Sequence, residues 1–398
     1  MKKIKLIFIR SKISSDPRQL EDQKNEYLTE LKKQYEISDD GEVFFFIESG
    51  GTEEEFRQIF SSYKEPYNLI ATNANNSLPA SLEITSFLKN KNLAYNLYHG
   101  KSEDILDVLN KKRAVSKGEN LPLKTKKKLL ENKRYGVVGK PSDWLISSDV
   151  NYTYAKDIFV VILIDITFDE FKREIDEAKS IVDPVVFESK LTKNITKETL
   201  EVALKIYSAL YSIIKKHDLD GLTVRCFDLL GVYHNTSCLA LALLNSHGYI
   251  ATCEGDVPAM LTMAIIKEKF HQSSFQVNPS FINEKERYGY FAHCTIPLDM
   301  VISYKFDTHF ESGLGIGIAG ELNLAKVTIF KVSSSLDKYE VFSGQISENL
   351  HFNNLCRTQL KIRFCEDIAP LIDLPCGNHL IIFKGDHKDE LVELLSTN

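Results

Sequence analysis

The sequence lacks the features that mark membrane proteins and nucleic-acid-binding proteins. None of its apolar runs reaches the roughly 20 residues that a membrane-spanning helix requires. No basic excess is present either, since the net charge is −6 and the pI is about 6.0. The basic stretch from Lys124 to Arg134 has no interleaved aromatic residues, which is typical of a domain boundary or an exposed helix. We therefore expect neither a membrane nor a nucleic acid as a partner.

Cysteine is missing from the first 225 residues, and the seven cysteines that follow are irregularly spaced. They form no CxxC or paired zinc pattern, which favours buried free thiols in a reducing compartment over a disulfide framework. The N-terminal segment MKKIKLIFIR begins like a signal peptide, but Arg10 interrupts its apolar run and no small-residue cleavage site follows. We therefore expect this segment to form a first strand, and the protein to be cytoplasmic.

Sequence motifs of several enzyme classes are also absent. No GxSxG elbow or Walker loop occurs, so hydrolase and P-loop functions have no support. Gly315, Gly317 and Gly320 satisfy GxGxxG, but a strand-like segment follows them rather than a helix, which argues against dinucleotide binding. His293 and Cys294 are neighbours on a strand-like segment and should point to opposite faces, which disfavours a nucleophilic thiol–imidazole pair.

What the first part of the sequence does contain is an alternation of short strand and helix patterns. Within residues 1–130 the strand-like segments are 2–9, 42–51, 67–72 and 93–100. The helical patterns are 19–35, 52–63 with Thr52 as the expected cap, 78–91 and 102–115. This alternation predicts an N-terminal Rossmann-like domain with a parallel, helix-covered sheet.

Two further domains are expected after this one. Residues 131–269 predict a second α/β domain, with strands at 134–139, 157–165, 222–227 and 249–253. Its helical patterns are 198–217, 238–248 and 257–270, and residues 229–237 are expected to form a turn. From 270 to 398 the segments are strand-like, punctuated by turns and poor in helices, which predicts a C-terminal antiparallel β-barrel-like domain or a sandwich.

The most informative stretch is Gly248 to Met263, GYIATCEGDVPAMLTM. A short apolar strand ends there and a helix begins, with Asp256 placed to cap the helix and Pro258 in its first turn. Glu254 lies just past the carboxyl end of the strand, where ligands bind in open α/β sheets. A carboxylate there can act as a base, bind a hard cation, or interact favourably with the helix dipole. Arg225 follows the preceding parallel strand, so we expect both residues on one edge of the sheet.

Two other side chains allow more than one interpretation. Trp144 is the only tryptophan and lies in a loop with Pro141 and Asp143. It is equally consistent with a sugar-stacking surface and with packing between domains. His379 follows a Gly-Asn turn and precedes a strand, and in isolation it is a weak candidate for a metal ligand.

Several motifs together resemble those of a known family. They are TVRCF, NTSCLALALLNSHGYIATCEGDVPAMLTM, NPSFI, AHCTIP, HFESGLGIGIAG, CRTQ and GNHLIIFKGDH. This set resembles the L-fucose isomerase / L-arabinose isomerase superfamily, and in particular its shorter, fucose isomerase-like members. The order and spacing of the motifs agree from about residue 135 to the C-terminus, with weaker similarity in ESGGTE and NLYHG.

The resemblance implies a cytoplasmic, homo-oligomeric aldose–ketose isomerase, trimeric or hexameric, with a small-molecule sugar as substrate. It also implies a divalent cation, usually manganese (Mn²⁺), held by a glutamate, an aspartate and a histidine. Glu254 and His379 match the family glutamate and histidine, whereas Asn278 stands where the family has its aspartate. Asparagine can offer a neutral oxygen to a cation, but it brings no charge and cannot act as a base.

In the family scheme a cation polarises the carbonyl group of the sugar, and carboxylates move a proton through an ene-diol. Glu254 is the clear base of the pair in this chain, and Asp256, Glu311 or a metal-bound water has to replace the second one. The predicted catalytic residues are therefore Glu254 and Asp256. The residues expected to contact substrate are Arg225, Trp144, His293, Glu311 and Arg357.

Two functions remain open on the sequence. One is a metal-dependent sugar isomerase, favoured by Glu254, Arg225 and His379. The other is a non-catalytic carbohydrate-binding or regulatory paralogue with a degraded metal site, favoured by Asn278.

Overall fold

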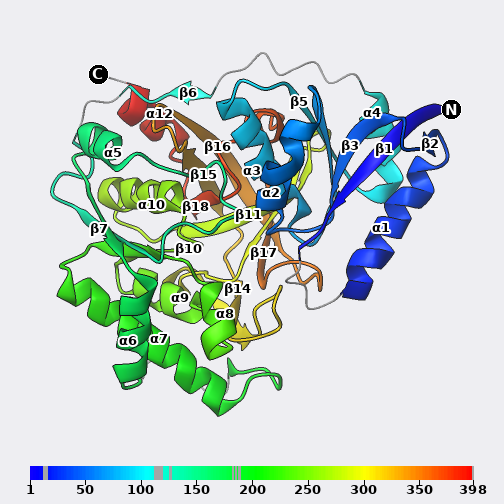
Figure 1. The fold of residues 1–398 in the computed structure, drawn as a ribbon. Helices are drawn as coiled ribbons and strands as arrows, with labels where there is room; N and C mark the ends of the chain where they lie inside the picture. Colours follow the sequence, from blue (N-terminus) through cyan, green and yellow to red (C-terminus); the bar gives the residue numbers. More distant parts are fainter. Residues whose placement is uncertain are drawn as a thin grey trace.

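The computed structural model describes residues 1–11, 17–111, 120–124, 128–181, 183, 186 and 190–396. The chain forms two parallel, helix-covered sheets and a closed antiparallel β-barrel (Figure 1). The predicted fold class, two Rossmann-like α/β units followed by an antiparallel barrel, is confirmed.

The N-terminal sheet has five parallel strands in the order β2-β1-β3-β4-β5. Its strands are β1 (Lys2–Ile9), β2 (Tyr35–Ile37), β3 (Glu42–Ile47), β4 (Tyr67–Ala71) and β5 (Tyr95–His99). Its helices are α1 (Pro17–Leu31), α2 (Glu53–Ile59), η1 (Phe60–Ser62), α3 (Ser77–Asn90), η2 (Ser102–Asp104) and α4 (Ile105–Asn110). The chain passes from one side of β1 to the other between β2 and β3, and ligands bind at such switch points in open sheets. The last residues of the helix expected at 102–115, from 112 onward, lie outside the described residues.

The second sheet has four parallel strands in the order β10-β9-β7-β8. Its strands are β7 (Arg134–Val138), β8 (Ile162–Ile166), β9 (Gly221–Val224) and β10 (Ile250–Cys253). Its helices are α5 (Tyr152–Phe159), α6 (Phe168–Glu177), α7 (Lys197–Lys216), α8 (Asp228–Tyr233), α9 (Cys238–Ser246) and α10 (Val257–Phe270).

Three local expectations were wrong. The apolar run 157–165 is not one strand, because α5 ends at Phe159, Val160 takes a left-handed φ of 56°, and β8 begins only at Ile162. The expected turn at 229–237 contains most of helix α8. Thr52 occupies the position before α2, but its hydroxyl donates to the carbonyl of Ser49 and makes no capping bond.

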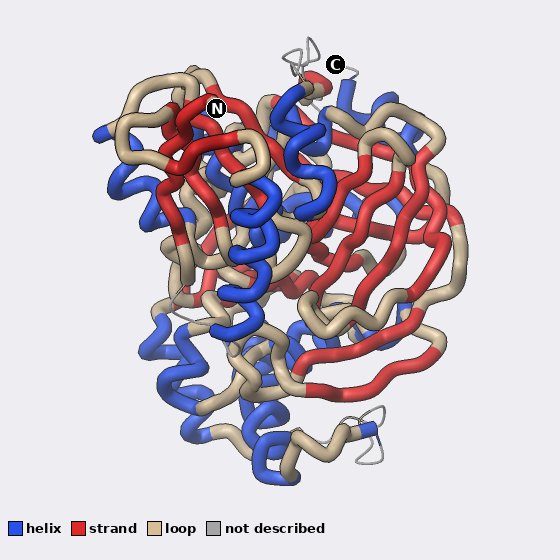
Figure 2. The backbone as a smooth tube through the Cα atoms, turned by 90° about the vertical axis from the view of Figure 1, so that its right-hand side faces the viewer, coloured by secondary structure: helices blue, strands red, loops and turns tan. Residues whose placement is uncertain are grey.

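The C-terminal part is a six-stranded antiparallel barrel with a short extra strand at its edge (Figure 2). Its strands are β11 (Phe275–Asn283), β12 (Tyr288–His293), β15 (Lys326–Val332), β16 (Lys338–Asn349), β17 (Thr358–Phe364), β18 (Leu380–Lys384) and the edge strand β6 (Leu121–Pro122). The pairing of β15 with β16 closes the barrel. A separate ribbon and short helices complete this part, namely β13 (Ser303–Asp307), β14 (Gly317–Glu321), η4 (Leu298–Met300), α11 (Pro370–Asp373) and α12 (Lys388–Ser396).

One hydrophobic cluster joins the three parts, with members such as Phe45, Leu222 and Ile329. Helix α3 packs against β11, and the side chain of Gln276 on β11 accepts a hydrogen bond from the backbone of Cys253 at 2.8 Å. The barrel is therefore packed against both α/β units, and residues from all three parts line one pocket.

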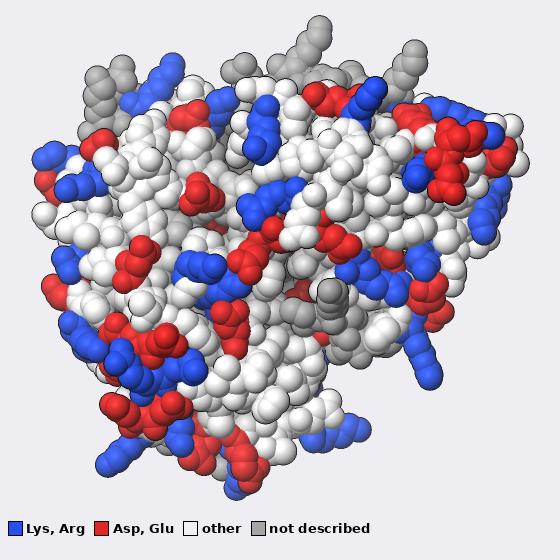
Figure 3. Space-filling model, in the orientation of Figure 1, with Lys and Arg blue, Asp and Glu red and all other residues white. Residues whose placement is uncertain are grey.

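The surface charges, the helices and the cysteines can be compared with the expectations drawn from composition. On the face shown in Figure 3, Lys and Arg side chains are interspersed with Asp and Glu. Within the part of the chain that the structure describes, no helix is both long enough and apolar enough to cross a membrane. All cysteines are free thiols and most are buried, as expected, but Cys365 is exposed.

Candidate functional site

The strand–turn–helix from β10 to α10 positions Glu254 as the sequence predicts. The backbone turns sharply after Cys253, with left-handed φ angles of 68° at Glu254 and 73° at Gly255. A Cβ atom at Gly255 would lie 2.5 Å from the carbonyl oxygen of Lys140, so only glycine fits the turn. Asp256 then caps α10, since its carboxylate accepts a hydrogen bond from the Ala259 amide at 2.6 Å, and this prediction is confirmed.

Glu254 is buried, with 8% exposure, and two side chains approach its carboxylate. The indole N–H of Trp144 donates to Oε2 at 2.7 Å, and Nε2 of His379 lies 3.6 Å from Oε1. Burial favours the neutral carboxyl, but His379 and Trp144 outweigh it and lower the pKa of Glu254. The lowered pKa favours the carboxylate form of Glu254, which can interact with a cation or accept hydrogen bonds. A non-glycine residue with positive φ is uncommon and, at a strand end, is typical of functional sites.

His379 is oriented by a buried ion-pair network. Its Nδ1–H donates to Oδ2 of Asp256 at 2.8 Å, and Nζ of Lys331 lies 3.2 Å from both oxygens of the same carboxylate. All three side chains have 0% exposure. Burial opposes the imidazolium, but the Glu254 and Asp256 carboxylates raise the pKa of His379 to about 9. Because Nδ1 is committed to Asp256, the ring presents Nε2 toward Glu254.

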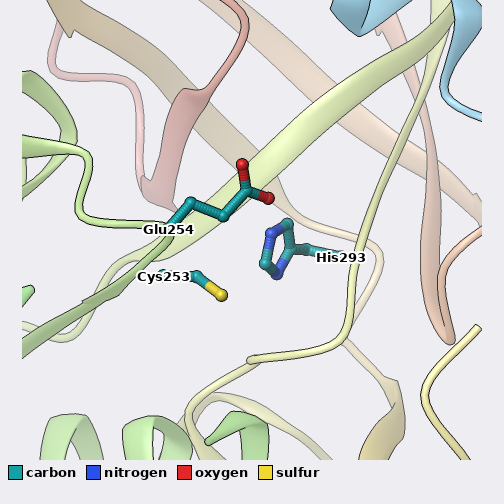
Figure 4. Close-up of side chains that lie close together, drawn as sticks. All are labelled: Cys253, Glu254 and His293. Atoms are coloured by element: carbon teal, nitrogen blue, oxygen red, sulfur yellow. The ribbon is translucent and has the colours of Figure 1, made fainter. Parts of the chain in front are cut away.

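His293 lies beside Glu254 (Figure 4), and the centroid of its ring is 5.5 Å from that of His379. Three possible ligand atoms lie within 4.8 Å of one another, one each from Cys253, Glu254 and His293. At this separation they could hold a metal ion together. Burial and the neighbouring His379 lower the pKa of His293 to about 3, so the imidazole is neutral. Its Nδ1 lies 2.9 Å from the hydroxyl of Thr295.

A pocket opens above these residues, where the switch point of the N-terminal sheet meets the second sheet and the barrel. It is lined by Ser11, Gly50, Gly51, Glu53, Asn76, Pro79, Ala80, Trp144, Phe227, Glu254, Asn278, Glu311 and Asn378. Several polar atoms around the pocket are buried without a hydrogen-bond partner among the described residues. They are Oε2 of Glu53, Oδ1 of Asn76, Oδ1 of Asn278, Oδ1 of Asn378 and Nε2 of His379. Buried polar atoms without partners are costly, and their gathering around one pocket indicates a ligand.

The expected metal ligands offer donor types that a divalent cation can use, provided that His379 loses a proton on binding. Glu254 offers an anionic oxygen, Asn278 an unpartnered amide oxygen and His379 an unpartnered ring nitrogen. Oxygen donors with one imidazole suit Mn²⁺ and similar divalent ions. Asp256 supports this set, because a carboxylate on the far nitrogen of a ligating histidine fixes its orientation.

The other predicted residues divide into those at the pocket and those beside it. Trp144 and Glu311 line it, and Glu311 accepts a hydrogen bond from Asn76 at 2.7 Å. Asp256 is buried beneath His379 and is not part of the lining. Trp144 also packs edge-on against Phe227, with ring centroids 4.9 Å apart, so it serves both packing and the site.

The two predicted arginines are occupied by protein partners. Arg225 lies at the same sheet edge as Glu254, as expected from the parallel pairing of β9 with β10. Its guanidinium bonds the carboxylates of Asp143 at 2.6 Å and Asp228 at 2.9 Å. Arg357 donates to the backbone and hydroxyl of Thr308. Contact of either arginine with substrate stays a prediction.

Four residues around the site were not singled out from sequence, namely Glu53, Asn76, Asn378 and Lys331. A signal existed for two of them, because Glu53 closes the ESGGTE segment and Asn76 lies in the NANNS loop, each just past a predicted strand. Nothing local marks Lys331, which looks like an ordinary outward-facing residue of a strand. It is fully buried beside Asp256 because its strand, β15, packs against α10, which Asp256 caps.

The fold and the pocket define an α/β protein with a C-terminal barrel and a buried carboxylate–imidazole centre where its parts meet. No family model matches the chain. The chain is similar to the sulfoquinovose isomerase of Clostridium sp. (strain MSTE9), with 23% identity over 217 residues. That match covers 51% of this chain and 48% of the relative, so the chain spans about half the length of the curated relative that it matches. The similarity is thus to a sugar isomerase, which is consistent with the resemblance noted in the motifs.

Proposed function

We propose that the protein is a metal-dependent aldose–ketose isomerase that acts on a small sugar through an ene-diol. One observation carries the proposal, namely that the Glu254 carboxylate and an unpartnered oxygen of Asn278 line one pocket, with the unpartnered Nε2 of His379 3.6 Å from that carboxylate. The named activity of the distant relative supports the same class of reaction.

The side chains have distinct tasks in this proposal. A bound divalent cation would polarise the two sugar oxygens between which the carbonyl moves. Glu254 has a lowered pKa and can accept the proton from C2 of the open-chain sugar and return it to C1. Trp144 holds the carboxylate in place, and Asp256 positions His379, so we assign Asp256 a positioning role rather than proton transfer.

Metal analysis tests the centre directly. The purified protein, Glu254→Gln and His379→Ala would be dialysed against Mn²⁺ and their bound metal measured. We expect one ion in the native protein and loss of it in both variants, with Glu55→Gln, an exposed change on α2, as the control. The same samples would be screened for isomerisation of neutral and sulfonated aldoses. Absence of bound metal in the native protein with excess Mn²⁺ would refute the proposal.

The alternative is a carbohydrate-binding protein without turnover, and Asn278 is the observation that favours it. Asparagine removes one negative charge from the centre relative to the family aspartate, which weakens cation binding. If the centre is only weakened, Asn278→Asp should raise Mn²⁺ affinity and turnover together. Tight binding of sugars by the native protein, with no turnover in either form, would establish the alternative.

A further inference from the structure

Glu53 lies at the edge of the N-terminal sheet where the carboxyl ends of its strands meet and the strand order reverses. It follows the Gly50-Gly51 turn after β3, and Ser11 follows the adjacent strand β1. All four residues line the same pocket as Glu254 and Asn278. A carboxyl group from the first residue of α2 therefore lines the pocket to which the second sheet and the barrel also contribute.

The structure gives Glu53 no internal partner for its second oxygen. The residue is 2% exposed, and its Oε2 has no hydrogen-bond partner among the described residues. Two other buried carboxylates have partners: Glu83 accepts from the Ser147 amide at 2.7 Å, and Asp256 is paired with Lys331. Glu340 also leaves its Oε2 without a partner, but within the described part of the chain only Glu53 has such an oxygen on a carboxyl that lines the pocket. Burying an unsatisfied carboxyl costs stability, and a ligand in the pocket would satisfy that of Glu53.

The chemistry of the site lacks one group. Moving a carbonyl from C1 to C2 requires proton transfer at carbon and also between the two oxygens, and Asn278 cannot exchange a proton. Glu53 lines the same pocket as Glu254, so one carboxyl can serve the carbon atoms and the other the sugar oxygens. Burial, together with Glu83 and Glu254, raises the pKa of Glu53, which favours its protonated form.

Resting on the proposed isomerase function, we propose that Glu53 is the second proton-transfer group and serves the sugar oxygens. The Glu254 carboxylate takes the proton from C2, the C2–H electron pair forms the C1=C2 bond, and the carbonyl pair moves to O1, which takes the proton of Glu53. The Glu53 carboxylate then takes the proton from O2, the C2=O bond forms, and C1 takes the proton back from Glu254. Both carboxyls end in their starting states.

Two other carboxyls suit this task less well. Glu311 lines the pocket, but Asn76 already donates to it at 2.7 Å. Asp256 has no exposure and is bonded by Lys331, His379 and the Ala259 amide.

The test compares Glu53→Gln, Glu53→Ala and the exposed control Glu55→Gln, each loaded with Mn²⁺, on the aldose that the native protein isomerises. General acid–base groups contribute about 100- to 10,000-fold, so we expect kcat of Glu53→Gln to fall at least about 100-fold. Its KM and its affinity for arabinitol, an alditol that cannot isomerise, should stay near the native values in titration calorimetry. Formate, a small carboxylic acid, should partly restore turnover in Glu53→Ala but not in Glu254→Gln.

The outcomes distinguish failure of the proposed role of Glu53 from failure of the proposed isomerase function. Near-native turnover of Glu53→Gln, with Glu254→Gln inactive, would overturn the role of Glu53 and leave the isomerase intact. Loss of arabinitol binding in Glu53→Gln, with no rescue of Glu53→Ala by formate, would also overturn it in favour of a structural role. If the native protein isomerises no aldose, the proposed function fails and the role of Glu53 fails with it.

Discussion

Trp144 shows how much a single side chain contributes to the site. Its indole N–H is the closest hydrogen-bond donor to Glu254, at 2.7 Å, while its ring packs on Phe227. The sequence left sugar stacking and packing between domains equally open for this residue. The structure adds a third role, because the bond orients the carboxylate and lowers its pKa.

Trp144→Phe should therefore weaken metal binding without unfolding the protein. Phenylalanine keeps an aromatic ring next to Phe227 but cannot donate a hydrogen bond to Glu254. Loss of a bond to a metal ligand typically costs about 10- to 100-fold in metal affinity, and we expect a loss in that range for Mn²⁺ by calorimetry. Tyr154→Phe, at an exposed aromatic, is the control. Unchanged Mn²⁺ affinity in Trp144→Phe would show that the indole bond does not support the centre.

Glu340 on β16 provides a residue-scale prediction for stability. Burial raises its pKa from 4.5 to about 7, so the folded state binds a proton that the unfolded state releases above pH 4.5. The contribution is fully present below pH 4.5 and is lost as the pH rises through 7. The full shift corresponds to about 3 kcal/mol in the free energy of unfolding.

Glu340→Gln should remove this pH dependence, since the amide stays neutral and its oxygen can still accept from the Cys376 amide. Urea unfolding at pH 4.5 and pH 8 should show equal stabilities at the lower pH and a more stable variant at the higher one. Glu348→Gln, at an exposed position of the same strand, should leave the native dependence in place. Parallel pH curves for the native protein and Glu340→Gln would contradict the assignment.

At the scale of elements, the strand–turn–helix around Glu254 is the best test of how the backbone builds the site. The N-cap, the proline in the first turn and the strand end were all predictable, because each rests on local conformational preferences. The strand expected at 157–165 was wrong because the end of α5 and the start of β8 are both apolar. Hydrophobic periodicity cannot show where one such element ends and the next begins.

Gly255→Ala should disturb this element. Alanine would be strained at a φ of 73°, and its Cβ would meet the Lys140 carbonyl at 2.5 Å, so the turn carrying Glu254 must shift. We expect a loss of about 1–3 kcal/mol in the free energy of unfolding, together with weaker Mn²⁺ binding. In Gly231→Ala no atom lies within 4 Å of the new Cβ, so this change in α8 should be neutral or slightly stabilising. Equal effects of the two substitutions would disprove the steric argument.

At the scale of the whole molecule, the three parts share one core and one pocket. A single hydrophobic cluster runs through both sheets and the barrel. The pocket draws residues from all three parts, such as Glu53, Glu254 and Asn278. Such a shared core favours unfolding as one cooperative unit.

We therefore expect one unfolding transition in urea. Trp144 is the only tryptophan and lies at the pocket where the parts meet, so its fluorescence reports this junction. Its transition should coincide with that of the far-ultraviolet circular dichroism. A fluorescence change that precedes the loss of secondary structure would show that the junction opens before the parts unfold.

The sequence by itself determined the alternation of strands and helices, the change to an antiparallel barrel and the place of Glu254 at a strand end. These features follow from short-range patterns, since side-chain periodicity and capping act over a few residues. Only the tertiary structure decided which side chains meet Glu254. Trp144 and His379 are brought to it from distant positions, and Glu53 reaches the pocket from another sheet, because sheet order and barrel closure set these contacts. Lys331 is the clearest case, a strand lysine that becomes fully buried only because the closed barrel packs against α10 and places it beside Asp256.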